Sequence, residues 1–283
     1  MHEVGPRDGL QNETHKVPTE IKIALVDKLA AIGFRHIEVT SFVSPKWVPQ
    51  LADASEVMAG IERQSGISYS VLTPNLKGYE RARQSQASEV AIFAAASETF
   101  SQRNINCTIE QSLERFEPVI AAAREDGTPV RGYVSCVANC PYEGAVEPEA
   151  VAAVSERLYL MGCHQVSLGD TTGTGTPEQI AAMLAAVAPR IPIESIAGHY
   201  HDTNHRALDN VRVSLDVGVR HFDSAIGGAG GCPYSPGAKG NLSTGSLVEL
   251  LVELGFETGL DRARLADAEV FLRKEVLPGH RSP

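Results

Sequence analysis

The sequence lacks the features that would place the protein in or across a membrane. No apolar run approaches the roughly 20 residues of a membrane-spanning helix, and no charged segment followed by an apolar one marks a signal peptide. We therefore expect a cytoplasmic protein without a membrane partner, while import of a longer form into an organelle stays open.

Positive charge and cysteine are also scarce. The net charge is −10 at pH 7, which argues against a nucleic-acid or anionic-membrane partner. The 5 cysteines are odd in number and irregularly spaced, which is typical of a reduced, intracellular protein. We expect four of them to be small buried apolar residues: Cys107, Cys136, Cys140 and Cys163.

The chain has no P-loop, no well-placed dinucleotide fingerprint and no internal repeat. What it does have is a regular alternation of apolar β-rich runs and longer helical patterns. The expected strands are His2–Val4, His36–Thr40, Ser68–Leu72, Glu89–Phe93, Val130–Ser135, His164–Leu168, Glu194–His199 and Arg220–Ser224. The expected helices are 19–32, 49–64, 76–86, 110–126, 148–162, 177–188, 204–217 and 243–254.

This alternation indicates parallel strands. Eight strand–helix units within 283 residues favour a closed (β/α)8 TIM barrel over an open doubly wound sheet. We expect one barrel domain that spans residues 1–283. The connection 93–108 is longer than the others and becomes polar toward its end, so it is a candidate active-site loop.

Residues that can carry chemistry follow the expected strands, where the active site of a parallel barrel lies. They are Arg7, Asp8, Glu38, Asp170, His199, His201, Cys232 and Asn241. The strands were assigned from apolar patterning alone, so this convergence on one rim is an independent observation. It predicts a single site at the C-terminal rim.

His199 and His201 stand two residues apart at the end of an expected strand. Side chains at positions i and i+2 of a strand point to the same side, so both imidazoles can face one ion. The alternative is a pair of hydrogen-bonded surface histidines. With Asp8 and Asn241 nearby, we favour a site without thiolate, which suits Mg²⁺ or Mn²⁺ better than structural zinc.

Cys232 lies in a glycine-rich loop, Gly227–Tyr234, and is followed by Pro233. A structural turn would need only the glycines, so a cysteine in so flexible a setting favours a reactive thiol. A second glycine cluster, Gly169–Gly175, precedes an expected helix and could hold a phosphate at its N-terminus.

These motifs resemble those of the hydroxymethylglutaryl-CoA lyase family, within the DRE-TIM metallolyases. The matching segments are long and cover nearly the whole chain: Glu3–Glu13, Thr40–Gln50, Val71–Gly78, Arg131–Cys136, Cys140–Gly144 and Gly230–Tyr234. The resemblance implies a TIM barrel, a divalent cation, and cleavage of 3-hydroxy-3-methylglutaryl-CoA to acetyl-CoA and acetoacetate. It also implies roles in leucine degradation and ketone-body formation.

The resemblance also assigns roles to residues of this chain. The implied metal ligands are Asp8, His199, His201 and Asn241, and the implied catalytic residues are Arg7, Cys232 and Glu38. Arg131 and Tyr133 match positions of the substrate pocket, where Arg7 also acts, and Asp170 matches a supporting carboxylate.

The expected chemistry is metal-assisted cleavage of a carbon–carbon bond, in which the cation acts as a Lewis acid on the substrate. The base for the hydroxyl proton is Asp8 or a metal-linked group, and Arg7 would stabilise the thioester oxygen as it becomes negative. Cys232 would protonate the enolate carbon of acetyl-CoA. Glu38 would position Arg7 or a water molecule.

The chain departs from the family pattern at Asn204-His205, at Ala229 and at Gly245-Ser246, and the usual start of the first strand is missing. These departures lie in loops near the rim and leave the exact acyl group open. An aldolase or Claisen-type synthase that acts on a 2-oxo acid, and an acyl-CoA-binding pseudoenzyme, are the alternatives. The partner expected from the resemblance is an acyl-CoA thioester, and a homodimer is the assembly considered.

Overall fold

Eight parallel strands close into a barrel, as the alternation of patterns predicted. The computed structural model describes residues 1–231 and 240–277. Around the barrel the strands follow chain order: β1 (His2–Glu3), β2 (His36–Ser41), β3 (Ser68–Leu72), β4 (Glu89–Ala95), β5 (Val130–Ser135), β8 (Gln165–Asp170), β9 (Ile196–Tyr200) and β10 (His221–Ser224). β1 pairs with both β10 and β2, which closes the ring.

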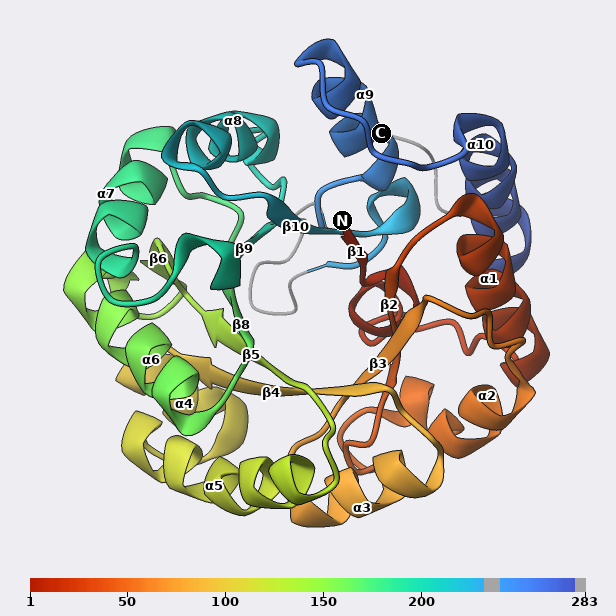
Figure 1. Ribbon diagram of the computed structural model, residues 1–283, viewed down its shortest axis with the longest axis horizontal. Helices are drawn as coiled ribbons and strands as arrows, with labels where there is room; N and C mark the ends of the chain where they lie inside the picture. The colour runs from red at the N-terminus through yellow and green to blue at the C-terminus, as the bar shows by residue number, and fades with distance from the viewer. Residues whose placement is uncertain (232–239, 278–283) are drawn as a thin grey trace.

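A ring of helices surrounds the strands and covers their outer faces (Figure 1). These helices are α1 (Thr19–Ile32), α2 (Ala54–Gly60), α3 (Leu76–Gln84), α4 (Glu98–Ile105), α5 (Ile109–Glu125), α6 (Pro148–Met161), α7 (Pro177–Val187), α8 (Ala207–Val217), α9 (Thr244–Glu253) and α10 (Arg262–Phe271). Helix boundaries carry their usual signals: Thr176 caps α7 in a capping box, and α1 ends at left-handed Gly33.

The structure differs from the sequence prediction in four places. The expected loop 93–108 contains α4, which Ser97 caps by accepting from the backbone N–H of Phe100. The expected helix 49–64 is a short 3₁₀ turn, Pro49–Leu51, followed by α2. A small hairpin, β6 (Asn139–Cys140) with β7 (Gly144–Ala145), and the helix α10 were not predicted.

The four cysteines expected to be buried are buried in the structure. The barrel interior is unusual in a different way, because it holds charged side chains as well as apolar ones. Glu3, Glu38, Arg131 and Asp223 are each at most 2% exposed. Buried charges of this kind persist only when hydrogen bonds and ion pairs replace their lost hydration.

Glu3 shows how such a charge is held. Its carboxylate accepts from the backbone N–H groups of Gly5 and Ile226 and from the hydroxyl of Thr244, at 2.9, 2.8 and 2.7 Å. Burial raises the pKa of Glu3 to about 7, although these hydrogen bonds oppose the rise. The folded protein therefore binds a proton here more tightly than the unfolded chain does.

This raised pKa predicts a loss of stability with rising pH. Between the ordinary value of 4.5 and about 7 the folded state holds the extra proton, so the free energy of unfolding falls as pH increases through that window. The shift corresponds to roughly 3 kcal/mol. A Glu3→Gln variant mimics the protonated acid and should not show this decline in urea denaturation at pH 5 to 8. Identical pH slopes in the two proteins would contradict the prediction.

Candidate metal centre and active site

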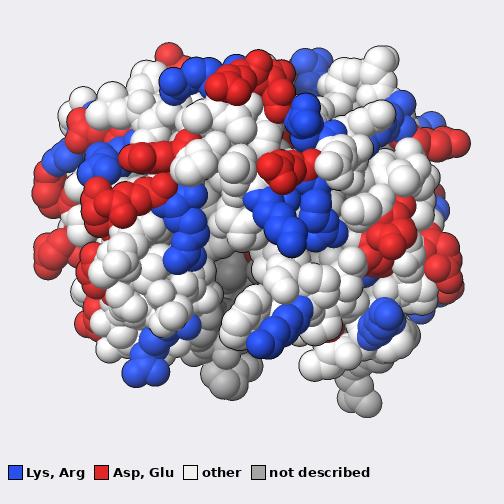
Figure 2. All heavy atoms as spheres, turned by 90° about the horizontal axis from the view of Figure 1, so that it is seen from below, with Lys and Arg blue, Asp and Glu red and all other residues white. Residues whose placement is uncertain are grey.

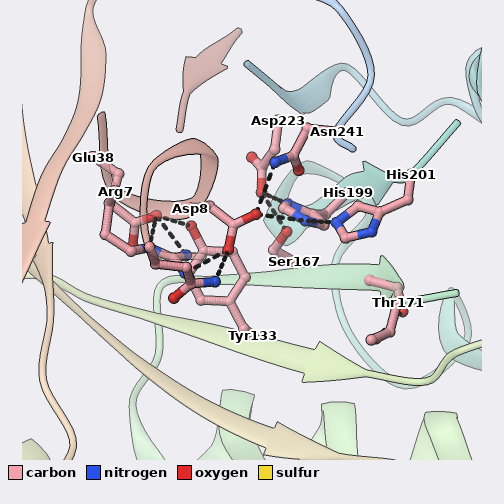
Figure 3. Close-up of polar contacts among 12 residues, drawn as sticks. Arg7, Asp8, Glu38, Tyr133, Ser167, Thr171, His199, His201, Asp223 and Asn241 are labelled. Atoms are coloured by element: carbon pink, nitrogen blue, oxygen red, sulfur yellow. Dashed lines mark hydrogen bonds and ion pairs between the residues drawn. The ribbon is translucent and has the colours of Figure 1, made fainter. Parts of the chain in front are cut away.

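The side chains predicted to form the site gather at the C-terminal ends of the barrel strands (Figure 3). Asp8 follows β1, His199 lies in β9, and His201 comes directly after β9. Asn241 forms an isolated bridge with His201. The structure thus brings all four of the expected metal ligands together from segments that are far apart in the sequence.

Asp8, His199 and His201 form a group that could hold a metal ion, because one ligand atom from each lies within 4.8 Å of the other two. The Nε2 atoms of the two histidines are 3.3 Å apart, and His199 Nε2 is 3.9 Å from Asp8 Oδ2. One carboxylate oxygen and two imidazole nitrogens that converge in this way fit a divalent cation.

Asn241 lies beside this group with its amide nitrogen, not its oxygen, toward Asp8. Its Nδ2 donates to Asp8 Oδ2 at 2.8 Å and to the carbonyl oxygen of Ala229 at 3.1 Å. Both of these oxygens are acceptors, so they bind the N–H groups of the amide. A ligand role for Asn241 requires the amide to turn over, which a cation at the site would favour.

The charges of the three ligand groups differ because their surroundings differ. Burial opposes the charged form of Asp8, but Arg7 and the two histidines outweigh it and hold its pKa at about 2. Burial and the neighbouring His199 lower the pKa of His201 to about 4. Burial also opposes the charged form of His199, but Asp223 outweighs it and raises the pKa of that ring.

Arg7 is buried beside Asp8 and is held by two carboxylates. Its Nε donates to Glu38 Oε2 at 2.7 Å, its Nη2 lies 2.6 Å from the same oxygen, and its Nη1 donates to Asp8 Oδ1 at 2.6 Å. A guanidinium has five N–H groups, so one remains on each terminal nitrogen. Arg7 lines the large pocket of the barrel, where those two groups can meet a substrate.

A tight turn of π-helical geometry, Gly5–Gly9, places Arg7 and Asp8 at the rim. The carbonyl oxygen of Val4 accepts from the backbone N–H groups of Arg7, Asp8 and Gly9. Gly5 packs so closely that an added Cβ would lie 2.6 Å from Glu3 and 2.9 Å from Ile226. The motif therefore supplies a glycine that the tight turn requires at position 5, as well as the charged side chains of Arg7 and Asp8.

Asp170 is fully buried at the end of β8 and organises the glycine cluster Gly169–Gly175. Its carboxylate accepts from the backbone N–H of Gly175 at 2.9 Å and from the hydroxyl of Thr172 at 3.4 Å. In the loop where a phosphate was expected, the carboxylate of Asp170 thus already occupies the backbone N–H of Gly175, and Thr176 caps the helix that follows.

Arg131 and Tyr133 were both expected in the substrate pocket, but in the structure only Tyr133 is among the residues that line it. Arg131 is 1% exposed, and its guanidinium is bound to Asp223, Gln165 and Tyr133 inside the barrel. The expected substrate contact of Arg131 does not fit this placement, because buried partners already take its N–H groups.

Cys232 lies outside the described residues. Gly231, next to it, lines the pocket and accepts from the Asn12 side chain at 3.0 Å. Asp223 was not predicted as a site residue, although its carboxylate contacts His199 at 3.1 Å. The available signal was an acidic residue inside the expected strand Arg220–Ser224, where a charge needs a buried partner.

The pocket above these residues has a volume of about 700 Å³. One side is polar and holds Arg7, Asp8 and the two histidines, while Leu72, Phe93 and Val43 give an apolar wall. Arg103 and Arg115 also line it, from α4 and α5. The face drawn in Figure 2 has a hollow with Lys and Arg side chains on either side of it.

Within the described residues, no helix combines the length and apolar character needed to cross a bilayer.

Residues 1–272 match the family model described as HMGL-like. A mitochondrial hydroxymethylglutaryl-CoA lyase from Gallus gallus is 54% identical over 270 residues, which cover 95% of this chain and 91% of that protein. Relatives named as cytoplasmic lyases also match.

A lyase from Pseudomonas aeruginosa, named for 3-hydroxy-3-isohexenylglutaryl-CoA and hydroxy-methylglutaryl-CoA, is 54% identical over 94% of this chain and 89% of its own length. Among solved structures, the HMG-CoA lyase of Brucella melitensis is 60% identical with a TM-score of 0.93, covering 95% of this chain and 97% of its own. The Acinetobacter baumannii lyase, solved with coenzyme A and 3-methylmalate, is 39% identical with a TM-score of 0.94 and covers 100% and 92%.

Proposed function

Because the chain belongs to the HMGL-like family, we propose that it is a divalent-metal-dependent lyase acting on 3-hydroxy-3-methylglutaryl-CoA. The products are acetyl-CoA and acetoacetate. One observation carries the proposal most strongly: Arg7 is salt-bridged to Asp8, and Asp8 belongs to the group of possible metal ligands in the same pocket. A charge-stabilising donor and a cation site thus face one substrate volume.

The proposed cation is Mg²⁺ or Mn²⁺, held by Asp8, His199, His201 and, after its amide turns, Asn241. Oxygen and imidazole ligands without a thiolate support this choice. When bound, such an ion polarises substrate oxygens as a Lewis acid. A pKa of about 2 makes Asp8 a weak proton acceptor, so the structure favours its role as a ligand over the role as base.

Arg7 is the proposed electrostatic catalyst. When the carbon–carbon bond breaks, negative charge develops on the thioester oxygen, and preorganised donors in a pocket stabilise such charge strongly. Glu38 and Asp8 fix the guanidinium from two sides and leave N–H groups for that oxygen. Glu38 is therefore proposed as the residue that positions Arg7.

Cys232 is proposed as the acid that protonates the enolate carbon. The support comes from the sequence alone, where a single thiol stands in the loop Gly227–Tyr234. A proton delivered at carbon completes acetyl-CoA and prevents the reverse reaction.

The acyl-CoA is proposed to enter with its phosphates near Arg103 and Arg115, which line the pocket from α4 and α5. The apolar wall of Leu72, Phe93 and Val43 is then available to the substituent on carbon 3 of the substrate. A relative acts on a longer 3-alkyl substrate by its name, so the chain length accepted here must be measured.

A panel of 3-hydroxy-3-alkylglutaryl-CoA thioesters, assayed with Mg²⁺ and with Mn²⁺, tests the proposed function. We expect cleavage of the methyl compound and a lower kcat/KM for substituents that the apolar wall does not accommodate. Absence of cleavage across the panel, together with turnover of a 2-oxo acid and acetyl-CoA, would replace the proposal by a synthase.

A homodimer is proposed as the assembly, and sedimentation equilibrium tests it.

Removal of one metal ligand gives a prediction that does not depend on turnover. A His201→Ala variant loses one imidazole of the triad and should bind Mn²⁺ at least about tenfold more weakly, as measured by calorimetry. His205→Ala is the matched control, because His205 is an exposed histidine 3.9 Å from a different carboxylate, Asp202. Equal affinity in His201→Ala and wild type would remove His201 from the ligand set.

A further inference from the structure

Asp223 lies on β10 inside the barrel, beneath the group of possible metal ligands, and no role has been assigned to it so far. Its side chain is 1% exposed. Its Oδ2 accepts from the hydroxyl of Ser167 at 2.8 Å and from Nη1 of Arg131 at 3.1 Å, and it lies 3.1 Å from Nδ1 of His199. Its Oδ1 accepts from Nη2 of Arg131 at 2.7 Å. Figure 3 shows the carboxyl group beside the His199 ring.

The contact with His199 decides which ring nitrogen is available to a cation. An ionised carboxylate can only accept hydrogen bonds, so Nδ1 of His199 must be the donor in this pair. The guanidinium of Arg131 donates to both oxygens of Asp223, at 3.1 and 2.7 Å, and such a paired charge keeps the carboxylate ionised. The Nε2 atom then carries the lone pair, and it points to Asp8 and His201.

The same carboxylate begins a second series of contacts on its other side. Nη1 of Arg131, which Asp223 holds, donates to the phenol oxygen of Tyr133 at 2.9 Å. That phenol donates to Glu38 Oε2 at 3.2 Å. The same Glu38 oxygen accepts from Arg7 at 2.7 Å. An unbroken, buried series of hydrogen bonds therefore joins Asp223 to Arg7.

We infer that Asp223 is a positioning residue that serves both halves of the site. Through His199 it presents a nitrogen lone pair to the cation. Through the series that begins at Arg131 it orients the guanidinium of Arg7. The kinetic part of this inference rests on the proposed function, whereas the metal-binding part does not.

An Asp223→Asn variant keeps the size of the side chain and removes its charge. The NH₂ group of the new amide is a donor. It either faces the N–H groups of Arg131, which are donors too, or faces Nδ1 of His199 and favours the tautomer with hydrogen on Nε2. We expect the affinity of the substrate-free protein for Mn²⁺ to fall by about 10- to 100-fold, measured by calorimetry. We also expect kcat to stay below the wild-type value at saturating Mn²⁺, where both proteins hold the metal.

Glu89→Gln is the matched control. Glu89 is likewise a carboxylate of a barrel strand, 4% exposed, with its pKa lowered to about 2. Its contacts are Ser68, His36 and His164, none of which belongs to the site. Both variants should lose thermal stability, but Glu89→Gln should bind Mn²⁺ as wild type does. A merely structural role for Asp223 would make the two variants alike.

Two further outcomes are separable. If wild type binds Mn²⁺ and Asp223→Asn does not, but neither cleaves the thioester, the proposed function fails and the positioning role stands. If Asp223→Asn folds and keeps normal Mn²⁺ affinity and kcat, the inference is overturned and the function stands.

If Asp223→Asn does not fold, Ser167→Ala provides the test. This variant removes one hydrogen bond that fixes Asp223 Oδ2 and should weaken Mn²⁺ binding about fivefold. Unchanged affinity in Ser167→Ala would overturn the inference in that case.

Discussion

An Arg7→Gln variant is expected to lose at least about 100-fold in kcat, the effect of removing a preorganised donor from developing charge. The structure explains why this loss should appear in kcat. Arg7 is fixed by Glu38 and Asp8 before any substrate arrives, so its remaining N–H groups do not need to reorganise. Steady-state kinetics with 3-hydroxy-3-methylglutaryl-CoA at saturating metal measures the change.

Arg103→Gln is the control for this experiment, since it removes the same charge from a different part of the same pocket. It should raise KM and leave kcat close to the wild-type value, as expected for binding that is uniform between ground and transition state. If Arg7→Gln also raised only KM, Arg7 would be a binding residue and its catalytic assignment would be wrong.

A Cys232→Ser variant is expected to lose roughly 10²- to 10⁴-fold in turnover, the range for losing a positioned acid. Serine nearly keeps the size of the side chain but is a far weaker acid. Mn²⁺ affinity should persist, because the proposed ligands lie elsewhere. Alkylating agents should inactivate the wild type, and substrate should slow that inactivation.

The buried cysteines supply the control for the thiol assignment. Burial raises the pKa of Cys163 to about 12, so its thiol is unreactive at neutral pH. A Cys163→Ala variant should therefore be inactivated by alkylation at the wild-type rate. Near-normal turnover in Cys232→Ser would show that another group protonates the enolate.

The fold could be predicted from the sequence because its signals are local. Apolar runs that alternate with helical patterns identified all eight barrel strands, and β3 and β5 were predicted with their observed bounds. The helix α4 was missed because its sequence, Glu98–Ile105, is mostly polar and resembles a loop. It is stabilised by a cap at Ser97 and by two buried side chains, Phe100 and Ser101, whose environment only the tertiary structure provides.

The site was less predictable where a residue acts through another residue. Asp8, His199 and His201 were found because their types and spacing indicate a cation site. The placement of Arg131 inside the barrel could not be read from its motif, because alternation along β5 gives a face but not the depth of the side chain. Its partner Asp223 lies 92 positions away, and no local pattern connects the two.

The barrel closes through contacts between the two ends of the described chain. β1 is only two residues long, and the Glu3 side chain is bound by Thr244, 241 positions later. Contacts of such sequence separation form late in folding because the intervening chain must be ordered first. During synthesis on a ribosome, Arg7 and Asp8 emerge before β10 and α9 but can reach their working positions only after β10 and the start of α9 have folded. A chain that terminates before that point should be inactive however well its remaining strands pair.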